Sequence, residues 1–171
     1  DFFLPEADEW RSEAWAMMRE RQDLSFVIET KREHRFFKAL PGDWGDGYEN
    51  VTILCSVEIQ RRVDDRIPAF LKLPVRHKGI LCEPLLEKLV LDAYLKTGEI
   101  AQVLCGGEQG ADARVCDFAW VLELMNQCVN CGVAFRFLRT GTFFRKGNRI
   151  YRIAEEEQEE QARRAGVDYT P

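Results

Sequence analysis

Short runs of apolar residues recur along the chain at fairly even intervals. Each run is continuously apolar rather than alternating, which is typical of strands buried on both faces of a parallel sheet. Amphipathic segments separate the runs, as expected for repeating βα units. The pattern predicts a mixed α/β fold with parallel strands at Ser25–Ile28, Val51–Val57, Gly79–Glu83, Gln102–Gly106 and Val133–Leu138.

The segments between these runs predict helices, and the helical pattern is clearer in some segments than in others. Asp117–Cys131 is the clearest, with Asp117 as a candidate N-terminal cap and a glycine just beyond its end. Pro68 is expected to break or kink the helix predicted over Gln60–Leu73. The other helical segments are Glu9–Arg21, Glu33–Leu40, the ambiguous Leu86–Leu95 and the highly charged Ala154–Arg164.

Five parallel strands are too few to close the usual βα barrel. The chain is therefore expected to form either an open sheet or part of a barrel whose first strands are absent. No linker interrupts the pattern, and 171 residues suit one domain with its own core. We predict a single TIM-barrel-like α/β domain over residues 1–171, a partial (β/α) barrel, with 154–171 as a charged helical tail.

Three of the apolar runs end at a cysteine, and each is followed within three residues by a glutamate, namely Glu58, Glu83 and Glu108. Ligands of parallel sheets bind outside the carboxyl ends of the strands. Three acids at this edge of the sheet therefore indicate a candidate site. Pro84 restricts Glu83 to an extended backbone, which would fix the direction of its carboxylate. A surface glutamate beside a loop proline is the simpler alternative.

Glycines and cations occur at the same predicted edge. Gly106 and Gly107 would let backbone approach a ligand closely, although they equally suit a tight turn. Lys31 and Arg32 follow the first strand, where they could bind a carboxylate or phosphate or pair with the three glutamates. The candidate ligand-binding residues are Lys31, Arg32, Glu58, Glu83, Gly106, Gly107, Glu108, Arg114 and Arg139.

The cysteines predict neither a metal site nor a disulfide framework. We interpret Cys55, Cys82 and Cys105 as small buried hydrophobic residues rather than thiolate ligands. Cys128 and Cys131 form a C-x-x-C pair near a helix end, whereas redox pairs occupy a helix start. Free thiols of this kind indicate a reducing, cytoplasmic compartment. Catalytic residues are left unassigned.

The net charge of -5 argues against a broad nucleic-acid surface or an anionic-membrane surface. It leaves room for a local basic pocket. No apolar stretch approaches membrane-spanning length, and no signal-peptide pattern opens the chain. The expected partners are a complementary segment or a second copy of the chain, with no membrane.

Several short segments occur in an order that is specific as a set, although each is weak alone. The series resembles the phage-associated three-cysteine-motif (Gp37/Gp68-like) family over nearly the whole chain. The segments are Glu6-Ala7-Asp8-Glu9-Trp10-Arg11, Thr30-Lys31-Arg32, Ser56-Val57-Glu58, Arg66-Ile67-Pro68, Cys82-Glu83-Pro84-Leu85-Leu86-Glu87, Gly106-Gly107-Glu108-x-Gly110, Ala113-Arg114-Val115-Cys116-Asp117 and Gln161-Ala162-Arg163-Arg164-Ala165-Gly166.

The resemblance implies an enzyme of the radical S-adenosylmethionine type with a complete or partial (β/α) barrel. Three cysteines of an early loop would hold a [4Fe–4S] cluster whose free iron binds S-adenosylmethionine. That loop would precede Asp1, so this chain would match the C-terminal part of the family. No clustered three-cysteine motif occurs here, and Gln109 and Leu138-Arg139 depart from the family's pattern.

The leading hypothesis is therefore the C-terminal barrel portion of a radical enzyme of unknown substrate. Its glutamates would line the mouth, Gly106 and Gly107 would cradle the ligand, and the cations would bind an anionic group. The alternative is a non-catalytic binding or assembly module, or a diverged remnant, because an incomplete barrel exposes an edge that invites pairing. An iron-independent enzyme ranks last, since no convincing general base is evident.

Overall fold

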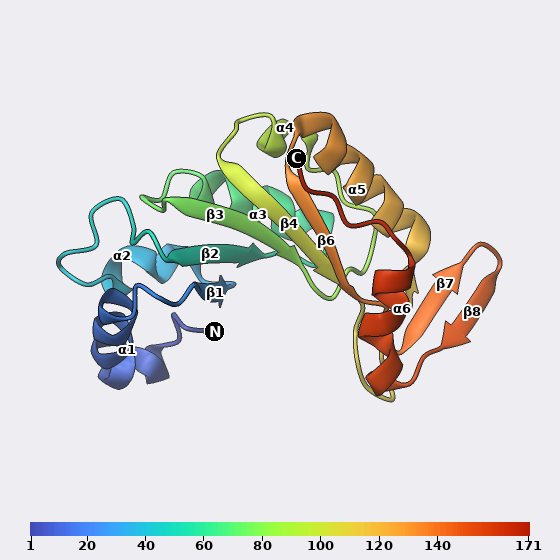
Figure 1. Ribbon diagram of the computed structural model, residues 1–171, viewed down its shortest axis with the longest axis horizontal. Helices are drawn as coiled ribbons and strands as arrows, with labels where there is room; N and C mark the ends of the chain where they lie inside the picture. Colours follow the sequence, from blue (N-terminus) through green and yellow to red (C-terminus); the bar gives the residue numbers. More distant parts are fainter.

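The computed structural model describes residues 1–171, and its centre is a five-stranded parallel sheet in the order β1-β2-β3-β4-β6 (Figure 1). The number of strands and their parallel direction confirm the sequence-based prediction, and each predicted end lies within two residues of the observed one. β1 and β6 stand at the two ends of the order and are not paired with one another. The strands span Phe26–Thr30 (β1), Val51–Ser56 (β2), His77–Cys82 (β3), Ile100–Gly106 (β4) and Ala134–Arg139 (β6).

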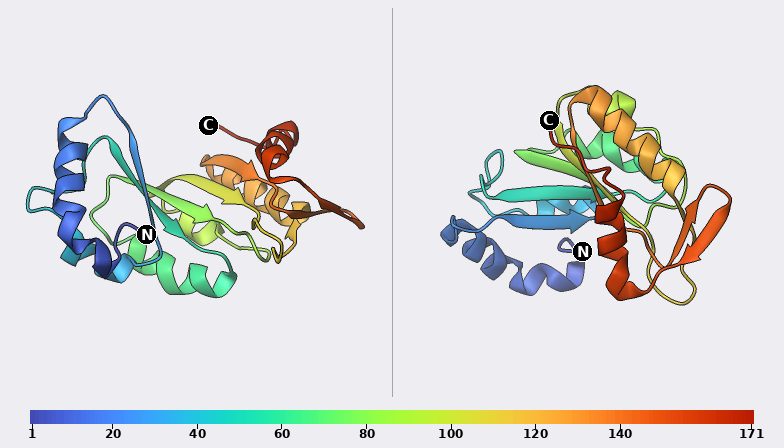
Figure 2. Two further views of the ribbon diagram at one scale, coloured as in Figure 1. Left: turned by 90° about the horizontal axis from the view of Figure 1, so that it is seen from below. Right: turned by 45° about the vertical axis from the view of Figure 1, so that its right-hand side comes forward.

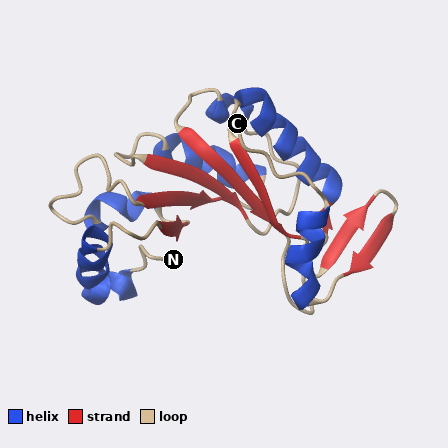
Figure 3. Cartoon of the chain, viewed as in Figure 1, coloured by secondary structure: helices blue, strands red, loops and turns tan.

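Helices connect and flank these strands (Figure 3). The clearest predicted helix is confirmed: Asp117 accepts a hydrogen bond from the Ala119 N–H at 2.9 Å, and Gly132 ends the helix with a φ of 65°. Pro68 lies inside α3, which stops two residues later at Phe70, short of the predicted end. The helices are α1 (Asp8–Glu20), α2 (Phe36–Ala39), α3 (Gln60–Phe70), α4 (Asp92–Leu95), α5 (Phe118–Cys131) and α6 (Gln158–Arg164), with 3₁₀ turns at Pro5–Ala7, Glu33–Arg35 and Glu155–Glu157.

A second, smaller sheet was not predicted from the sequence. It contains β5 (Cys116–Asp117), β7 (Phe143–Lys146) and β8 (Arg149–Arg152), in the order β5-β7-β8. β7 and β8 form an antiparallel hairpin that projects from the body of the protein beside α6 (Figure 1). Its two-residue turn carries Gly147 at a φ of 60°, a conformation that glycine adopts without a steric penalty.

The main core lies between the helices and one face of the large sheet (Figure 2). Val63, Ile67 and Phe70 recur at helical spacing on α3 and are fully buried there. The opposite face of the sheet also carries apolar side chains. Leu54 on β2 and Leu81 on β3 are only 1% and 2% exposed, although neither belongs to the main core. The centre of the sheet is therefore apolar on both faces, as the continuous apolar runs indicate, whereas its outer strands carry exposed Glu29 and Arg136 on the second face.

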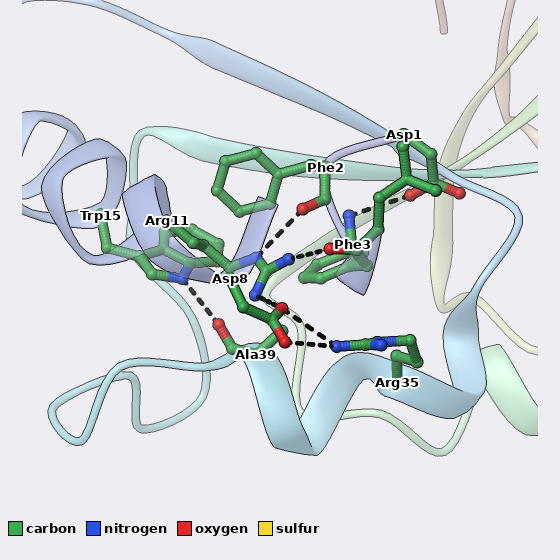
Figure 4. Close-up of polar contacts among 9 residues, drawn as sticks. Asp1, Phe2, Phe3, Asp8, Arg11, Trp15, Arg35 and Ala39 are labelled. Atoms are coloured by element: carbon green, nitrogen blue, oxygen red, sulfur yellow. Dashed lines mark hydrogen bonds and ion pairs between the residues drawn. The ribbon is translucent and has the colours of Figure 1, made fainter. Parts of the chain in front are cut away.

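The first residues of the chain are held against α1 by the buried side chain of Arg11 (Figure 4). Its guanidinium donates to the carbonyl oxygens of Phe2 and Leu4, at 3.0 Å and 2.7 Å. It also pairs with Asp8, which accepts a second pair of bonds from Arg35. Asp1 in turn accepts hydrogen bonds from Thr30 and Lys31, which places the beginning of the chain beside the carboxyl end of β1.

The two edges of the large sheet differ in what covers them. Tyr169 exchanges two backbone hydrogen bonds with Phe135 of β6, at 2.8 Å and 2.9 Å, and thereby covers part of that edge. The outer edge of β1 has no strand beside it. No helix is long and apolar enough to span a lipid bilayer.

Candidate functional site

The carboxyl ends of all five parallel strands lie at one edge of the sheet, and a charged side chain ends each strand or follows it within two residues. The register pairs Ser56 with Leu81 and Cys82 with Cys105, so Glu58, Glu83 and Glu108 leave neighbouring strands at nearly the same level. The three predicted acids therefore lie at one edge of the large sheet. Each of them is paired with a cation, and the three carboxylates do not form one cluster.

Glu58 lies between two cations. One carboxylate oxygen pairs with Lys31, and the other lies 3.4 Å from Nη1 of Arg66. The same Arg66 nitrogen donates to the Ser56 carbonyl oxygen at 2.6 Å, which fixes the arginine against the end of β2. Arg66 comes from α3 and was not among the predicted site residues. Its position in the helix that directly follows Glu58 was the available signal.

Glu83 shares a more buried position with Arg139, the last residue of β6. Its Oε1 lies 2.8 Å from Nε of Arg139, although that nitrogen has no aligned hydrogen-bond acceptor. Burial raises the pKa of Glu83, the Arg139 charge opposes this, and the charge of Glu29 adds to it. A side chain on Gly106 would bring its Cβ to 2.5 Å from the Glu83 carboxylate. The glycine therefore leaves the space that this carboxylate occupies.

Glu108 is held by Arg114. The Arg114 side chain donates two hydrogen bonds to the carboxylate, at 2.8 Å and 2.6 Å, and its backbone N–H donates a third at 2.7 Å. These hydrogen bonds lower the pKa of Glu108 to about 2. The pair closes the loop that follows β4, so Arg114 acts here as a partner of an acid.

Gly107 is packed against the segment that follows β6. Its N–H donates to the Arg139 carbonyl oxygen at 2.9 Å and is thus already engaged within the protein. A Cβ at this position would lie 2.6 Å from the Thr140 carbonyl carbon and 2.8 Å from the Gly141 Cα. Close backbone packing is a sufficient reason for glycine here.

A hollow of about 220 Å³ opens between the ends of β3, β4 and β6. No large apolar side chain lines it, and Nη1 of Arg139 donates to the Gln109 Oε1 at 2.7 Å across its wall. Lys31, Arg32, Glu58 and Arg114 lie outside it. The residues that line it are Glu83, Pro84, Gly107, Glu108, Gln109 and Arg139.

Arg32 and Lys31 have a partner that the sequence did not suggest, the side chain of Asp1. Asp1 Oδ2 accepts from the Lys31 backbone N–H at 2.9 Å and lies 3.7 Å from Nε of Arg32. Its Oδ1 accepts from the Thr30 hydroxyl at 3.1 Å. Both predicted cations therefore neutralise acids of the protein in this structure.

The strand-end cysteines lie in the core. Cys55, Cys82 and Cys105 are buried, and burial raises the pKa of each thiol, to about 12 for Cys55. No three histidine, cysteine or acidic side chains gather in an arrangement that could hold a metal ion. The geometry agrees with the interpretation of these cysteines as small hydrophobic residues.

The tie between Arg114 and Glu108 gives a direct test of this geometry. In the Arg114→Ala variant, the pKa of Glu108 is expected to rise from about 2 toward the ordinary value for glutamate. Because the pKa of Glu108 is lower in the folded state than in the unfolded state, its ionised carboxylate stabilises the fold at pH values above the unfolded-state pKa. This contribution to stability is lost as the pH falls toward about 2. The variant should thus lose less stability on acidification than the parent protein.

Carbon-detected NMR titration of the side-chain carboxyl groups measures this pKa. Arg136→Ala is the matched control, because Arg136 is exposed and makes no ion pair with Glu108. An unchanged Glu108 titration in Arg114→Ala would contradict the proposed cause of the shift.

The fold and this edge define an α/β protein with a parallel sheet and a polar, charge-paired site at the carboxyl ends of its strands. The chain belongs to the family described as "Protein of unknown function (DUF5131)", whose sequence pattern matches residues 1–169. Neither a curated protein nor a solved structure matched the chain. The family description names no reaction and no cofactor, so the resemblance to radical S-adenosylmethionine enzymes stays a prediction.

Proposed function

We propose that residues 1–171 form the C-terminal part of a (β/α) barrel of the radical S-adenosylmethionine type, with the strand-end edge as its ligand-facing mouth. The single observation that carries the proposal is the convergence of Glu83, Glu108 and Arg139 around one hollow at the ends of three parallel strands. Ligand sites of parallel sheets occupy this position. The buried Leu54 and Leu81 at the centre of the second face suit the interior of a barrel.

The hollow offers both signs of charge to a small polar ligand. The Glu83 and Glu108 carboxylates can accept hydrogen bonds from an ammonium group or from ribose hydroxyls, and Arg139 can bind a carboxylate. S-adenosylmethionine carries all three kinds of group. Of the two acids, Glu83 is better suited to exchange a proton with a ligand. Burial raises the pKa of Glu83, whereas Arg114 lowers the pKa of Glu108.

The cysteines of this chain do not fit an iron–sulfur cluster. Cluster ligands are thiolates, whereas Cys55, Cys82 and Cys105 are buried thiols with raised pKa values on successive strands. The proposal therefore requires that a complementary segment outside residues 1–171 supplies the cluster. Within this chain, the strand-end residues would bind and orient the ligand.

Two measurements test the proposal. Calorimetric titration of the chain with S-adenosylmethionine is expected to give binding that Arg139→Gln removes and Arg136→Gln retains, since Arg136 lies on the same strand but outside the hollow. Anaerobic iron and sulfide reconstitution of the chain joined to its natural upstream coding sequence is expected to give a cluster. Absence of a cluster in the extended protein, together with no binding by the chain, would refute the proposal.

A second candidate is a non-catalytic module that pairs with another chain or a second copy. The free edge of β1 favours it, because no strand lies beside this edge to pair with its backbone. Light scattering over a range of concentrations would then reveal a dimer or larger species. A monomer at every concentration, with no ligand or partner bound, would count against this candidate.

A further inference from the structure

The hairpin formed by β7 and β8 is a local concentration of positive charge in an acidic protein. Residues 143–152 contain two lysine or arginine residues on each strand and no acid, although the whole chain has a net charge of -5. Arg145 pairs with Asp117, whereas Lys146, Arg149 and Arg152 form no ion pair. Every residue of β8 is exposed. These cations are therefore free to contact a partner.

The hairpin register places cations and aromatic rings on the same face. Phe144 lies opposite Tyr151, and Lys146 lies opposite Arg149, so alternation brings all four side chains to one side of the ribbon. Tyr151 is 43% exposed, so its ring is accessible to a partner. A face of this composition presents both stacking surfaces and phosphate-binding charges.

That face forms one wall of a hollow of about 250 Å³. The start of α5 contributes Phe118, and α6 contributes Gln161 and Arg164 to the opposite wall. Nζ of Lys146 lies 5.2 Å from the centre of the Phe118 ring, within the range of a cation–π contact. The hollow thus combines aromatic walls with cations and neutral hydrogen-bonding groups.

We propose that the hairpin and its hollow bind single-stranded nucleic acid. One unstacked base would enter the hollow and stack against Tyr151, while Lys146 and Arg149, which lie opposite one another on the hairpin, contact the neighbouring phosphates. Aromatic platforms combined with a positively charged groove are the usual means of binding single strands. The inference uses residues that the proposed strand-end site does not use, so the two stand or fall separately.

The shape of the hollow and the arrangement of charge favour a single strand over a nucleic-acid duplex or a ligand with one phosphate group. The base must be unstacked to enter the hollow, and the bases of a duplex are already stacked. The free cations continue past the hollow to the tip of the hairpin, farther than one phosphate group can reach. The acids Glu155–Glu157 follow the hairpin directly, and Glu160 pairs with Arg164, so the basic footprint is narrow.

Fluorescence anisotropy with a labelled oligonucleotide of about 16 nucleotides tests the proposal, in single-stranded DNA and RNA and in duplex form. The double variant Lys146→Gln/Arg149→Gln is expected to reduce the slope of log K against log salt by about 1.4, the value for two lost phosphate contacts. Tyr151→Ala is expected to weaken binding at least about fivefold.

The matched control is Lys72→Gln/Lys96→Gln, which removes the same charge from exposed positions outside the hairpin and should leave the slope unchanged. Circular dichroism and thermal melting of each variant establish that it is folded. No binding of single strands at low salt, an equal loss in both double variants, tighter binding of duplex, or equally tight binding of a free nucleotide would each overturn the proposal.

Discussion

Replacement of Gly107 by alanine is expected to destabilise the protein by about 3 kcal/mol. The new Cβ would lie 2.6 Å from the Thr140 carbonyl carbon and 2.8 Å from the Gly141 Cα, both of which are backbone atoms. A side chain could rotate away from such a clash, but backbone that follows β6 can move only if the hydrogen bond from the Gly107 N–H to the Arg139 carbonyl oxygen is strained. The same movement would displace Glu108 from the hollow.

Urea unfolding followed by circular dichroism measures the loss of stability. Gly42→Ala is the matched control, because no atom lies within 4 Å of its added Cβ and Gly42 does not have a positive φ. Its stability should change by less than about 0.5 kcal/mol. Equal unfolding midpoints for the two variants would show that the close packing of Gly107 is absent in solution.

The Arg11→Met variant is expected to lose about 3 kcal/mol of stability. Methionine keeps most of the buried apolar stem, so the loss comes from the guanidinium. Its removal leaves the Phe2 and Leu4 carbonyl oxygens without their donor, as Figure 4 illustrates. The first residues of the chain should then detach from α1 and α2.

Arg19→Met on the same helix is the control for this change. Arg19 pairs with Asp43 at an exposed position, where an ion pair contributes roughly 0–1 kcal/mol. Thermal melting gives the stability of both variants, and hydrogen exchange of the Phe3 and Lys31 amides reports on the beginning of the chain, because both donate to Asp1. Similar melting curves for the two variants would mean that the buried contacts of Arg11 are not important for stability.

The acids of the candidate site could be predicted because each lies within two residues of the end of a strand. Apolar runs identify the strands, and the carboxyl ends of parallel strands must meet at one edge, so Glu58, Glu83 and Glu108 were placed correctly on that edge. Pairing of Lys31 with one of these acids was among the alternatives that the sequence offered, and it is observed with Glu58. Arg66, the second partner of Glu58, comes from a helix face and was not predicted. Nor was Asp1, which contacts Lys31 and Arg32 from a segment with no strand of its own.

The small second sheet was missed although the sequence carries a signal for part of it. Gly147-Asn148 stands between two short runs rich in aromatic and β-branched residues, which is a recognised hairpin pattern. The charges of the hairpin weaken that pattern, because no apolar face alternates regularly along either strand. β5 has only two residues and exists because β7 lies beside it.

The sequence by itself determined the α/β class, the five parallel strands, the capped helix that begins after Asp117, and the edge to which the acids are delivered. These features depend on local periodicity and on residues close to one another in the chain. The tertiary structure alone decided which cation neutralises each acid, why Gly107 must be glycine, and how Tyr151 and Lys146 come to share a hollow with α6. Such contacts join residues distant in sequence, and their geometry depends on the packing of whole elements rather than on any local pattern.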